Sequence, residues 1–347
     1  MNKIKIKKIG ILTGGGDCPG LNPAIRGVVY RALSEGIECV GILDGWKGML
    51  EAKSVPLTLQ DVEYIINKGG TIIGTSRTNP YKKENGTEKC VETLKKLQLD
   101  AVIAMGGEDT LGVATKLYKE KNFPVVGVPK TMDNDLGVTD YTFGFDTAVT
   151  VAVDAAERLL DTGRSHRRIM VLEVMGRHAG WVALFTGIAS AADWILIPEE
   201  EVNIEKMCEH LKKVYERKKT ALVIVSEGVI LPGLKTEKEE LDEFGHMILK
   251  KRGIGEQVAD IIEKNTGIET RVAVIGHIQR GGAPTLFDRI LGLRVGVKAV
   301  ELVLEGKFGY MVALKGNEVV PVPLEEATGQ LKTVSSQWIQ FMKHFFK

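Results

Sequence analysis

The segment "GVPKTMDNDLG" (127–137) places one lysine, one threonine and two aspartates close together. They are Lys130, Thr131, Asp133 and Asp135. If the segment is extended, side chains alternate in direction, so the threonine and both aspartates share one side and the lysine takes the other. Two carboxylates beside a hydroxyl can accept a proton and hold a divalent cation, which exceeds what the alternative, an Asx-rich turn, requires. We therefore expect an acid–base and metal-binding face here.

A second segment, "AMGGEDT" (104–110), combines a glycine pair with two acidic residues. Glycines that close an apolar run let backbone N–H groups approach a phosphate. Glu108 and Asp109 follow this pair directly, although carboxylates repel phosphate. The segment thus predicts a site where an anionic ligand and two carboxylates lie together.

Two further loops combine glycines with features of anion binding. The loop "LTGGGDCPGLN" (12–22) has the glycine turn and helix start of a phosphate site, yet it matches neither G-x-G-x-x-G nor a Walker A loop, and a packing turn explains it equally well. The loop "GGTIIGTSR" (69–77) ends in Arg77, whose planar guanidinium suits phosphate, with a solvated surface arginine as the alternative.

Arginines also flank two apolar runs in the second half of the chain, "RIMVLEVMG" and "RVAVIGH". They are Arg168, Arg177, Arg271 and Arg280, and together they would bracket an anionic ligand. His277 is a candidate phosphate contact, with a structural histidine as the alternative. Glu227 is a candidate for binding sugar hydroxyls, with an exposed loop carboxylate as the alternative.

The elements that must position these loops are short apolar runs that alternate with helix-period segments. Runs such as "IGILTG", "DAVIAMG", "PVVGVP" and "ALVIVSEG" are typical of buried strands in a parallel sheet. This alternation predicts an α/β fold of two doubly wound, Rossmann-like domains, in which ligands bind beyond the carboxyl ends of the strands. The crossover between domains is expected near "GFDTAV".

The composition excludes several classes of function. The chain has 347 residues, and 46 Lys and Arg against 45 Asp and Glu give a formal net charge of +1, so no overall field attracts nucleic acid or an anionic membrane. The four cysteines lack the spacing of a zinc site, and neither a signal peptide nor an apolar run long enough to span a bilayer is present. We expect a cytoplasmic protein that binds neither nucleic acid nor a membrane.

The loops together offer several phosphate sites and an aspartate pair, without a Ser-His-Asp set or a thiol nucleophile. They predict phosphoryl transfer to a hydroxyl of a phosphorylated small molecule. Five ordered segments, "GILTGGGDCPGLNPAIRGVV", "GGEDT", "PKTMDNDL", "EVMGRHAGW" and "RVAVIGHIQRGGAPTLFDR", resemble the phosphofructokinase family from about Gly10 to Phe308. The resemblance implies two α/β domains with the active site in the cleft, and fructose 6-phosphate as the acceptor on its 1-hydroxyl.

The resemblance also implies roles for the loop residues. Asp133 resembles the general base, with Thr131 and Met132 beside it on the substrate and Asp135 supporting the metal and the loop. Glu108 would serve Mg²⁺, directly or through water, since family members often have Asp there. The donor would be contacted by Gly15 and Arg77. The sugar-phosphate positions are Arg168, Met175, Gly176, Arg177, Glu227, Arg271, His277, Ile278, Gln279 and Arg280.

The same resemblance implies an assembly and a division of the chain. Arg168 and Arg271 would reach in from a neighbouring subunit, so a homodimer or homotetramer is expected. Residues 1–145 plus about 268–310 would form the donor domain. Residues from about 146 to 267 plus 311–347 would form the sugar-phosphate domain and the C-terminal tail.

The two acidic residues of "GGEDT" bear on the phosphoryl donor. ATP-using members resemble "GGDGS" and "PGTIDND", with glycine where this chain has Asp109 and Lys130. Asp109 would repel the α-phosphate of ATP, while Lys130 would supply a cation to free pyrophosphate and assist catalysis. The pair is typical of the pyrophosphate-dependent type, whose reversible reaction serves glycolysis and gluconeogenesis.

Three alternatives remain open at this point. The nearest is an ATP-dependent 6-phosphofructokinase, which requires Asp109 and Lys130 to move aside. Another kinase with a glycine–aspartate loop, such as an NAD or lipid kinase, leaves "GHIQRGG" and "EVMGR" unexplained. A sugar-phosphate sensor without turnover leaves the lysine and aspartates of "PKTMDNDL" unexplained.

Overall fold

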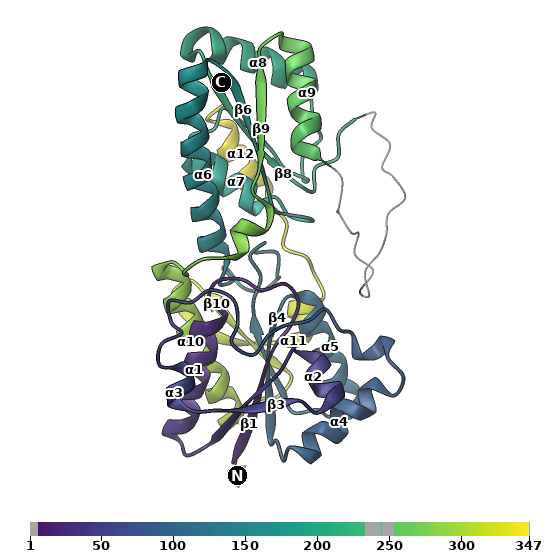
Figure 1. The fold of residues 1–347 in the computed structure, drawn as a ribbon. Helices are drawn as coiled ribbons and strands as arrows, with labels where there is room; N and C mark the ends of the chain where they lie inside the picture. The colour runs from purple at the N-terminus through teal and green to yellow at the C-terminus, as the bar shows by residue number, and fades with distance from the viewer. Residues whose placement is uncertain (1–5, 233–243, 245–252, 347) are drawn as a thin grey trace.

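The computed structural model describes residues 6–232, 244 and 253–346, which form two lobes, each built around its own sheet (Figure 1). The first sheet has seven strands in the order β11-β10-β5-β4-β1-β2-β3. Only β3 and β11, at its two edges, run antiparallel to their neighbours. The strands are β1 (Lys8–Thr13), β2 (Glu38–Ile42), β3 (Ser54–Leu57), β4 (Ala101–Gly106), β5 (Val125–Pro129), β10 (Tyr310–Lys315) and β11 (Glu318–Pro323).

Both faces of the seven-stranded sheet are covered by helices. The buried strand β4 alternates between two cores: Ile103 and Met105 pack on one side, while Val102 and Ala104 pack on the other. The first core also takes side chains from α1 (Leu21–Ser34), α3 (Leu59–Val62) and α10 (Leu286–Leu304). The second core takes them from α2 (Trp46–Glu51), α4 (Gly86–Lys96), α5 (Glu108–Lys121) and α11 (Leu324–Thr328), and the short 3₁₀ helix η1 (Pro80–Lys82) precedes α4.

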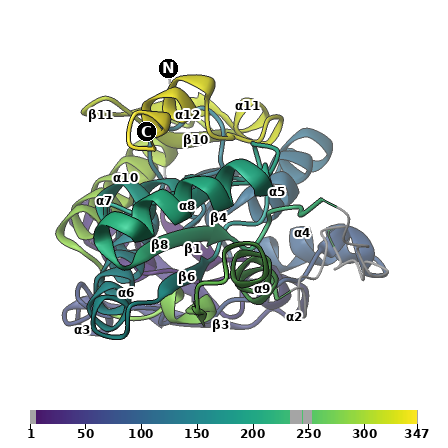
Figure 2. The ribbon, with the colours of Figure 1, turned by 90° about the horizontal axis from the view of Figure 1, so that it is seen from above.

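The second sheet has four parallel strands in the order β7-β8-β6-β9. They are β6 (Ile169–Val174), β7 (Trp194–Leu196), β8 (Ala221–Ser226) and β9 (Thr270–Val274). Its helices also lie on both faces, with α6 (Phe145–His166), α7 (Trp181–Ala189) and α12 (Ser336–Lys343) on one core and α8 (Ile204–Lys218) and α9 (Ile254–Thr266) on the other (Figure 2). The predicted α/β fold with two doubly wound sheets is therefore confirmed.

Two strands lie in different sheets from those that the predicted domain division implies. Residues 268–310 were expected in the donor domain, but β9 pairs with β6 in the four-stranded sheet. Residues 311–347 were expected in the other domain, but β10 pairs with β5, and β11 completes that edge of the seven-stranded sheet. Because the chain crosses between lobes again after β9 and after α11, the boundaries near 268 and 311 do not follow the sheets.

The cysteines and the apolarity of the helices bear on two expectations from the sequence. All four cysteines are buried and free. Among the helices in the described ranges, none has the length and apolarity to cross a membrane.

Candidate active site

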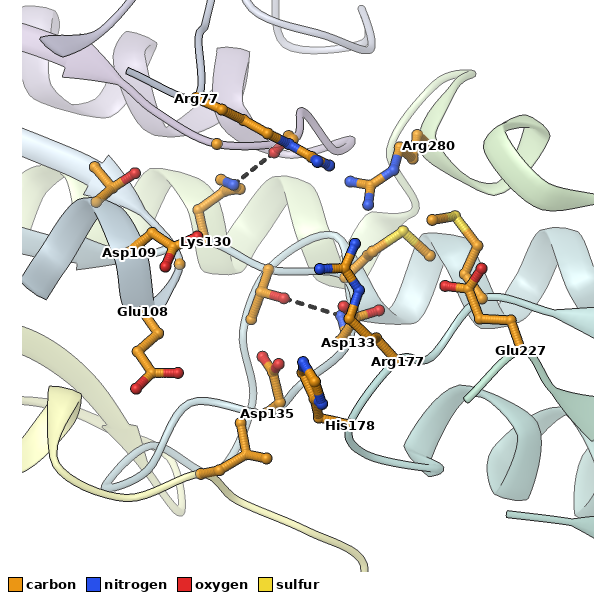
Figure 3. Close-up of a pocket in the computed structure, with 18 of the residues that line it drawn as sticks. Arg77, Glu108, Asp109, Lys130, Asp133, Asp135, Arg177, His178, Glu227 and Arg280 are labelled. Atoms are coloured by element: carbon orange, nitrogen blue, oxygen red, sulfur yellow. Dashed lines mark hydrogen bonds between the residues drawn. The ribbon is translucent and has the colours of Figure 1, made fainter. Parts of the chain in front are cut away.

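The cavity between the two sheets collects the carboxyl ends of strands from both lobes. It has a volume of about 480 Å³, and residues that follow β1, β4, β5, β6, β8 and β9 line it (Figure 3). This is where an open parallel sheet presents its ligand site. The lining residues are Gly15, Gly16, Arg77, Gly107, Glu108, Asp109, Thr110, Lys130, Thr131, Met132, Asp133, Asp135, Met175, Arg177, His178, Glu227, His277, Arg280 and Leu331.

The loop after β5 holds its aspartates through local hydrogen bonds. The Asp133 amide donates to Thr131 Oγ1 at 3.1 Å (Figure 3), and Thr142 Oγ1 donates to the Thr131 carbonyl at 2.6 Å. Asn134 takes a left-handed conformation with φ 51°, which asparagine tolerates, and its Oδ1 accepts from the Thr142 amide at 3.1 Å. The loop is thus fixed from behind, and the side chains of Asp133 and Asp135 face the cavity.

One carboxylate oxygen of Asp133 is available to a ligand in the cavity. Its Oδ1 is buried and has no hydrogen-bond partner among the described residues. An unpaired buried acceptor is rare in folded proteins and costs stability, so its position in a cavity points to a ligand donor. A substrate hydroxyl in the cavity would satisfy it.

Two acidic side chains on this part of the cavity, Asp135 and Glu227, have a raised pKa. Burial, together with the neighbouring Asp133 carboxylate, raises the pKa of Asp135 to about 7. Burial and the same carboxylate also raise the pKa of Glu227. This excess of negative charge favours a cation in the cavity, because a nearby positive charge would restore the ionised carboxylates.

The side of the cavity that was predicted to bind the phosphoryl donor, called the donor side below, begins with a glycine turn after β1. Gly15 has φ 78°, a conformation that favours glycine. Its backbone N–H donates a hydrogen bond to the Ser76 carbonyl at 3.0 Å. Lys130 is only 4% exposed, and its ammonium donates to the Gly16 carbonyl at 2.5 Å (Figure 3). Burial lowers the pKa of Lys130. A buried ammonium therefore lies directly beside the turn that was predicted to hold phosphate.

Asp109 and Glu108 open helix α5, which follows β4. Both residues occupy the first turn, where the helix dipole favours acidic side chains, and both line the cavity. Asp109 and Lys130 therefore face the same cavity from the ends of adjacent strands, β4 and β5.

Arg280 joins the two halves of the cavity. It ends the 3₁₀ helix η2 (Gly276–Arg280), and its guanidinium donates to the Asp17 carbonyl at 3.0 Å. A Cβ atom at Gly16 would lie 2.5 Å from the guanidinium, so this approach requires glycine there. Arg280 was predicted at the sugar-phosphate site, and in this chain it contacts the donor-side turn.

Five of the predicted sugar-phosphate residues do not line the cavity. Gln279 is fully buried, where it accepts from the Met175 amide at 2.8 Å and donates to the Ala148 carbonyl at 3.2 Å, so it braces the loop after β6. Ile278 is 68% exposed. Gly176 lies behind the wall, where its amide donates to Glu227 Oε1 at 3.4 Å.

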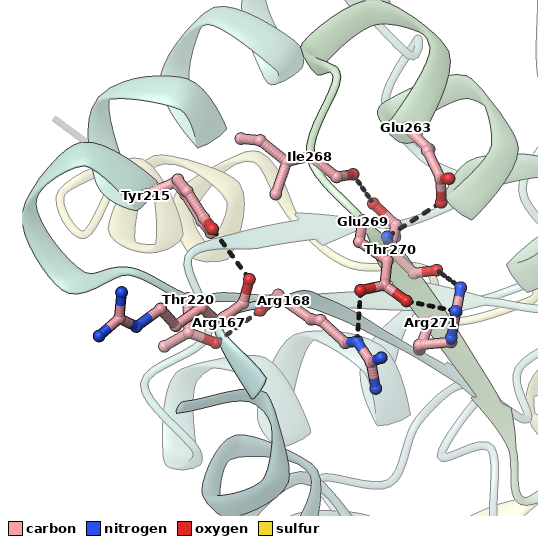
Figure 4. A network of polar contacts seen from close by, with 9 residues as sticks. All are labelled: Arg167, Arg168, Tyr215, Thr220, Glu263, Ile268, Glu269, Thr270 and Arg271. Carbon is pink, nitrogen blue, oxygen red and sulfur yellow. Dashed lines mark hydrogen bonds and ion pairs between the residues drawn. The ribbon is translucent and has the colours of Figure 1, made fainter. Parts of the chain in front are cut away.

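The other two, Arg168 and Arg271, lie at the amino ends of β6 and β9. Both form ion pairs with Glu269 (Figure 4), at 2.7 Å for Arg168. Conversely, His178 and Leu331 line the cavity although the sequence reading did not select them. His178 lies within the quoted segment "EVMGRHAGW", so its motif could have found it, whereas Leu331 lies outside every motif.

The predicted Mg²⁺ site would not be a preformed cage of protein ligands. In the ranges that the structure covers, no three His, Cys, Asp or Glu side chains are placed to hold a metal ion together. Mg²⁺ characteristically binds one or two carboxylates and completes its shell with water and substrate phosphates. Glu108 and Asp135 on the cavity wall fit that pattern, since each adds to the negative charge at the other.

Comparison with known proteins identifies the family. The family model described as Phosphofructokinase matches residues 8–303. The chain is 55% identical to the pyrophosphate--fructose 6-phosphate 1-phosphotransferase of Dictyoglomus thermophilum and 49% identical to that of Streptomyces coelicolor, over 98% of this chain and 98% and 99% of theirs. It is 46% identical to ATP-dependent 6-phosphofructokinase 3 of S. coelicolor, over 94% of this chain and 96% of that protein.

A solved structure extends the match to the whole fold. The pyrophosphate-dependent phosphofructokinase of Marinobacter aquaeolei superposes with a TM-score of 0.84 at 22% identity, covering 98% of this chain and 92% of that one. The chain therefore belongs to the phosphofructokinase family, as its ordered motifs predicted.

Proposed function

We propose that this member of the phosphofructokinase family transfers a phosphoryl group from pyrophosphate to the 1-hydroxyl of fructose 6-phosphate, releasing phosphate and fructose 1,6-bisphosphate. The observation that carries the proposal is that Asp109 and Lys130 line the same cavity as the Asp133 loop. The relatives named for pyrophosphate are also more similar to this chain than the relative named for ATP.

Asp133 acts as the general base. Its buried Oδ1 accepts the proton of the 1-hydroxyl as the sugar oxygen forms a bond to the terminal phosphorus of pyrophosphate. The bond from that phosphorus to the bridging oxygen breaks, and inorganic phosphate leaves with the bond electrons. Thr131, which accepts from the Asp133 amide, keeps the carboxylate oriented toward the cavity.

The remaining residues position the donor and offset its charge. Lys130 and Arg77 supply fixed positive charge on the donor side, and such pre-placed charge is the main source of catalysis in phosphoryl transfer. Mg²⁺, held by Glu108 and Asp135 together with the phosphates, would neutralise the phosphate oxygens when bound. Gly15 shapes the turn against which the donor lies.

The same wall disfavours ATP. Asp109 adds negative charge where additional phosphate of a nucleotide would lie, and Lys130 fills the space beside Gly16. Because Lys130 is buried and donates to a backbone carbonyl, moving it aside would cost that hydrogen bond. The ATP-dependent alternative therefore requires a rearrangement of this wall.

We also propose that a second copy of the chain completes the acceptor side, in a homodimer or homotetramer. Arg168 and Arg271 lie outside the cavity of their own chain, at the far ends of their strands. Exposed apolar side chains also lie along β9, η2 and α10, as an interface between copies requires. They are Val274, Ile278, Leu286, Phe287 and Ile290. We place the enzyme in the cytoplasm, consistent with its four free cysteines.

A ³¹P NMR time course tests the proposed reaction. Fructose 6-phosphate, pyrophosphate and Mg²⁺ are incubated with the purified full-length protein. Loss of pyrophosphate in step with equal gains of inorganic phosphate and a new sugar 1-phosphate ester is expected, and product plus phosphate should regenerate pyrophosphate. Release of phosphate without the ester would instead indicate pyrophosphate hydrolysis and would contradict the proposal.

A further inference from the structure

The chain runs between the lobes once more near its end, through a short segment between α11 and α12 (Figure 1). We call residues 330–334 the C-terminal strap. Before the strap, α11 packs in the core of the seven-stranded lobe, and after it α12 packs in the core of the four-stranded lobe. The strap therefore bridges the two walls of the cavity, and its Leu331 is part of the lining.

One residue of the strap, Lys332, forms hydrogen bonds with the loop that carries Asp133 and Asp135. Its amide donates to the Asp135 carbonyl at 2.8 Å. Its ammonium donates to Asn134 Oδ1 at 3.1 Å and to the carbonyls of Thr139 and Asp140 at 2.9 and 2.8 Å. Three acceptors match the three N–H donors of a lysine ammonium, so none is left unsatisfied.

The same strap is fastened to the loop after β6. The indole N–H of Trp181 donates to the Lys332 carbonyl at 2.8 Å, and the ammonium lies 5.6 Å from the centre of the Trp181 ring. One carboxylate oxygen of Glu199 accepts from the amides of both Val334 and Gly180, at 2.8 and 2.9 Å. Gly180 and Trp181 directly follow the cavity residues at 177 and 178.

We propose that Lys332 is a positioning residue for phosphoryl transfer, which holds the Asp133–Asp135 loop against the Arg177–Trp181 segment across the cleft. The proposal rests on the proposed function for its catalytic consequence. Lys332 is not part of the lining of the active-site cavity, and it acts through Asn134, which stands between the two aspartates in a left-handed conformation. A loop held in that conformation depends on surrounding contacts to keep it.

Because Asn134 lies between Asp133 and Asp135 in the chain, loss of its contact with Lys332 would affect the rate of phosphoryl transfer. A small change in the backbone at Asn134 would shift the flanking Asp133 and Asp135 relative to the sugar hydroxyl and the donor phosphorus. Misplacement of a reacting group by about 1 Å can lower the rate about 100-fold. Loss of Lys332 is therefore expected to lower kcat, while the groups that bind both substrates remain in place.

The variant Lys332→Met tests the proposal in the full-length protein. Methionine keeps much of the side-chain volume but removes all three side-chain donors. The matched control is Lys315→Met, because exposed Lys315 borders the same small cavity as Lys332 without a place in the strap. We expect kcat with pyrophosphate to fall about 10- to 100-fold in Lys332→Met, with either KM changed less than about threefold, and the control to match wild type.

Hydrogen–deuterium exchange of the substrate-free protein supplies a readout besides activity. Faster exchange at the amides of Asp133 and Thr142 is expected in Lys332→Met and not in Lys315→Met. If wild type itself does not turn over, the proposed function fails, and the exchange data still decide whether Lys332 holds the loop. Wild-type kcat or unchanged exchange in a folded Lys332→Met protein would overturn the proposal.

A milder variant covers the case in which Lys332→Met does not fold. Trp181→Phe keeps an aromatic ring but removes the indole donor to the Lys332 carbonyl. We expect a smaller fall in kcat, about threefold to tenfold, with unchanged KM values. Unchanged kcat in Trp181→Phe would then count against the strap as a positioning element.

Discussion

The two halves of the cleft differ in how much of the site one chain supplies. On the donor side, every predicted donor or metal residue lines the cavity: Gly15, Arg77, Glu108, Asp109 and Lys130. On the acceptor side, two predicted arginines, Arg168 and Arg271, lie outside it. They precede or begin β6 and β9, and a six-residue strand such as β6 is about 20 Å long. Arg168, just before β6, therefore cannot reach the cleft of its own chain, and Arg271 pairs with Glu269 outside the cavity.

The largest expected effect concerns Asp133, which serves both halves. Asp133→Asn removes the proton acceptor but keeps the shape of the side chain, so kcat should fall by about 10²- to 10⁴-fold with little change in the KM for fructose 6-phosphate. Steady-state kinetics checks this, with Asp154→Asn on the exposed face of α6 as the matched control. Near-normal turnover of Asp133→Asn would remove this residue from the role of base.

The second-largest expected effect distinguishes the acceptor half of the cleft from the donor half. Arg271→Ala removes a guanidinium that we assign to a neighbouring copy's acceptor site, so the KM for fructose 6-phosphate should rise about 10- to 100-fold. The KM for pyrophosphate should stay within about twofold, because the donor half lies within one chain. Exposed Arg164, on α6, provides the control Arg164→Ala. An equal rise in both KM values would show that the two halves of the cleft do not bind their substrates independently.

The smallest expected effect concerns the joint between the lobes. Buried Asp288 on α10 accepts from the amide and the hydroxyl of Thr147 on α6, at 2.8 and 2.5 Å. Burial raises the pKa of Asp288 to about 6. A folded-state pKa above the unfolded value gives stability that is present at low pH and is lost as the pH rises from about 4 to about 6.

Asp288→Asn should therefore remove this loss of stability with rising pH. The free energy of unfolding of the variant, relative to wild type, should rise by about 2 kcal/mol between pH 4 and pH 7. Urea unfolding at the two pH values measures this difference. A difference between the two proteins that does not depend on pH would contradict the raised pKa.

The sequence predicted the loops better than it predicted their sheets. Glycines and charged residues directly after apolar runs mark strand ends locally, which is why Glu108 and Lys130 could be selected from the sequence, and both line the cavity. Sheet membership depends on pairing between distant segments, and the apolar pattern of β9 and β10 is the same for either sheet. That is why both strands were assigned to the wrong lobe.

Side-chain roles within a motif were also beyond sequence reasoning. Gln279 and Arg280 are neighbours in "GHIQRGG", yet one is buried as a brace and the other contacts the donor-side turn. Motif order places such residues near the site, but only packing decides which of them face the cavity. Lys332 belongs to no motif, because its contacts are mostly to backbone carbonyls that any sequence supplies.

The central claim, that one wall of the cleft selects the donor, is tested most directly by comparing two donors. The kcat/KM of the full-length wild-type protein is measured with pyrophosphate and with ATP, at saturating fructose 6-phosphate and Mg²⁺. The charge and position of Asp109 and Lys130 predict a value at least about 100-fold higher for pyrophosphate. Comparable or higher kcat/KM with ATP would contradict the claim, although the family assignment would stand.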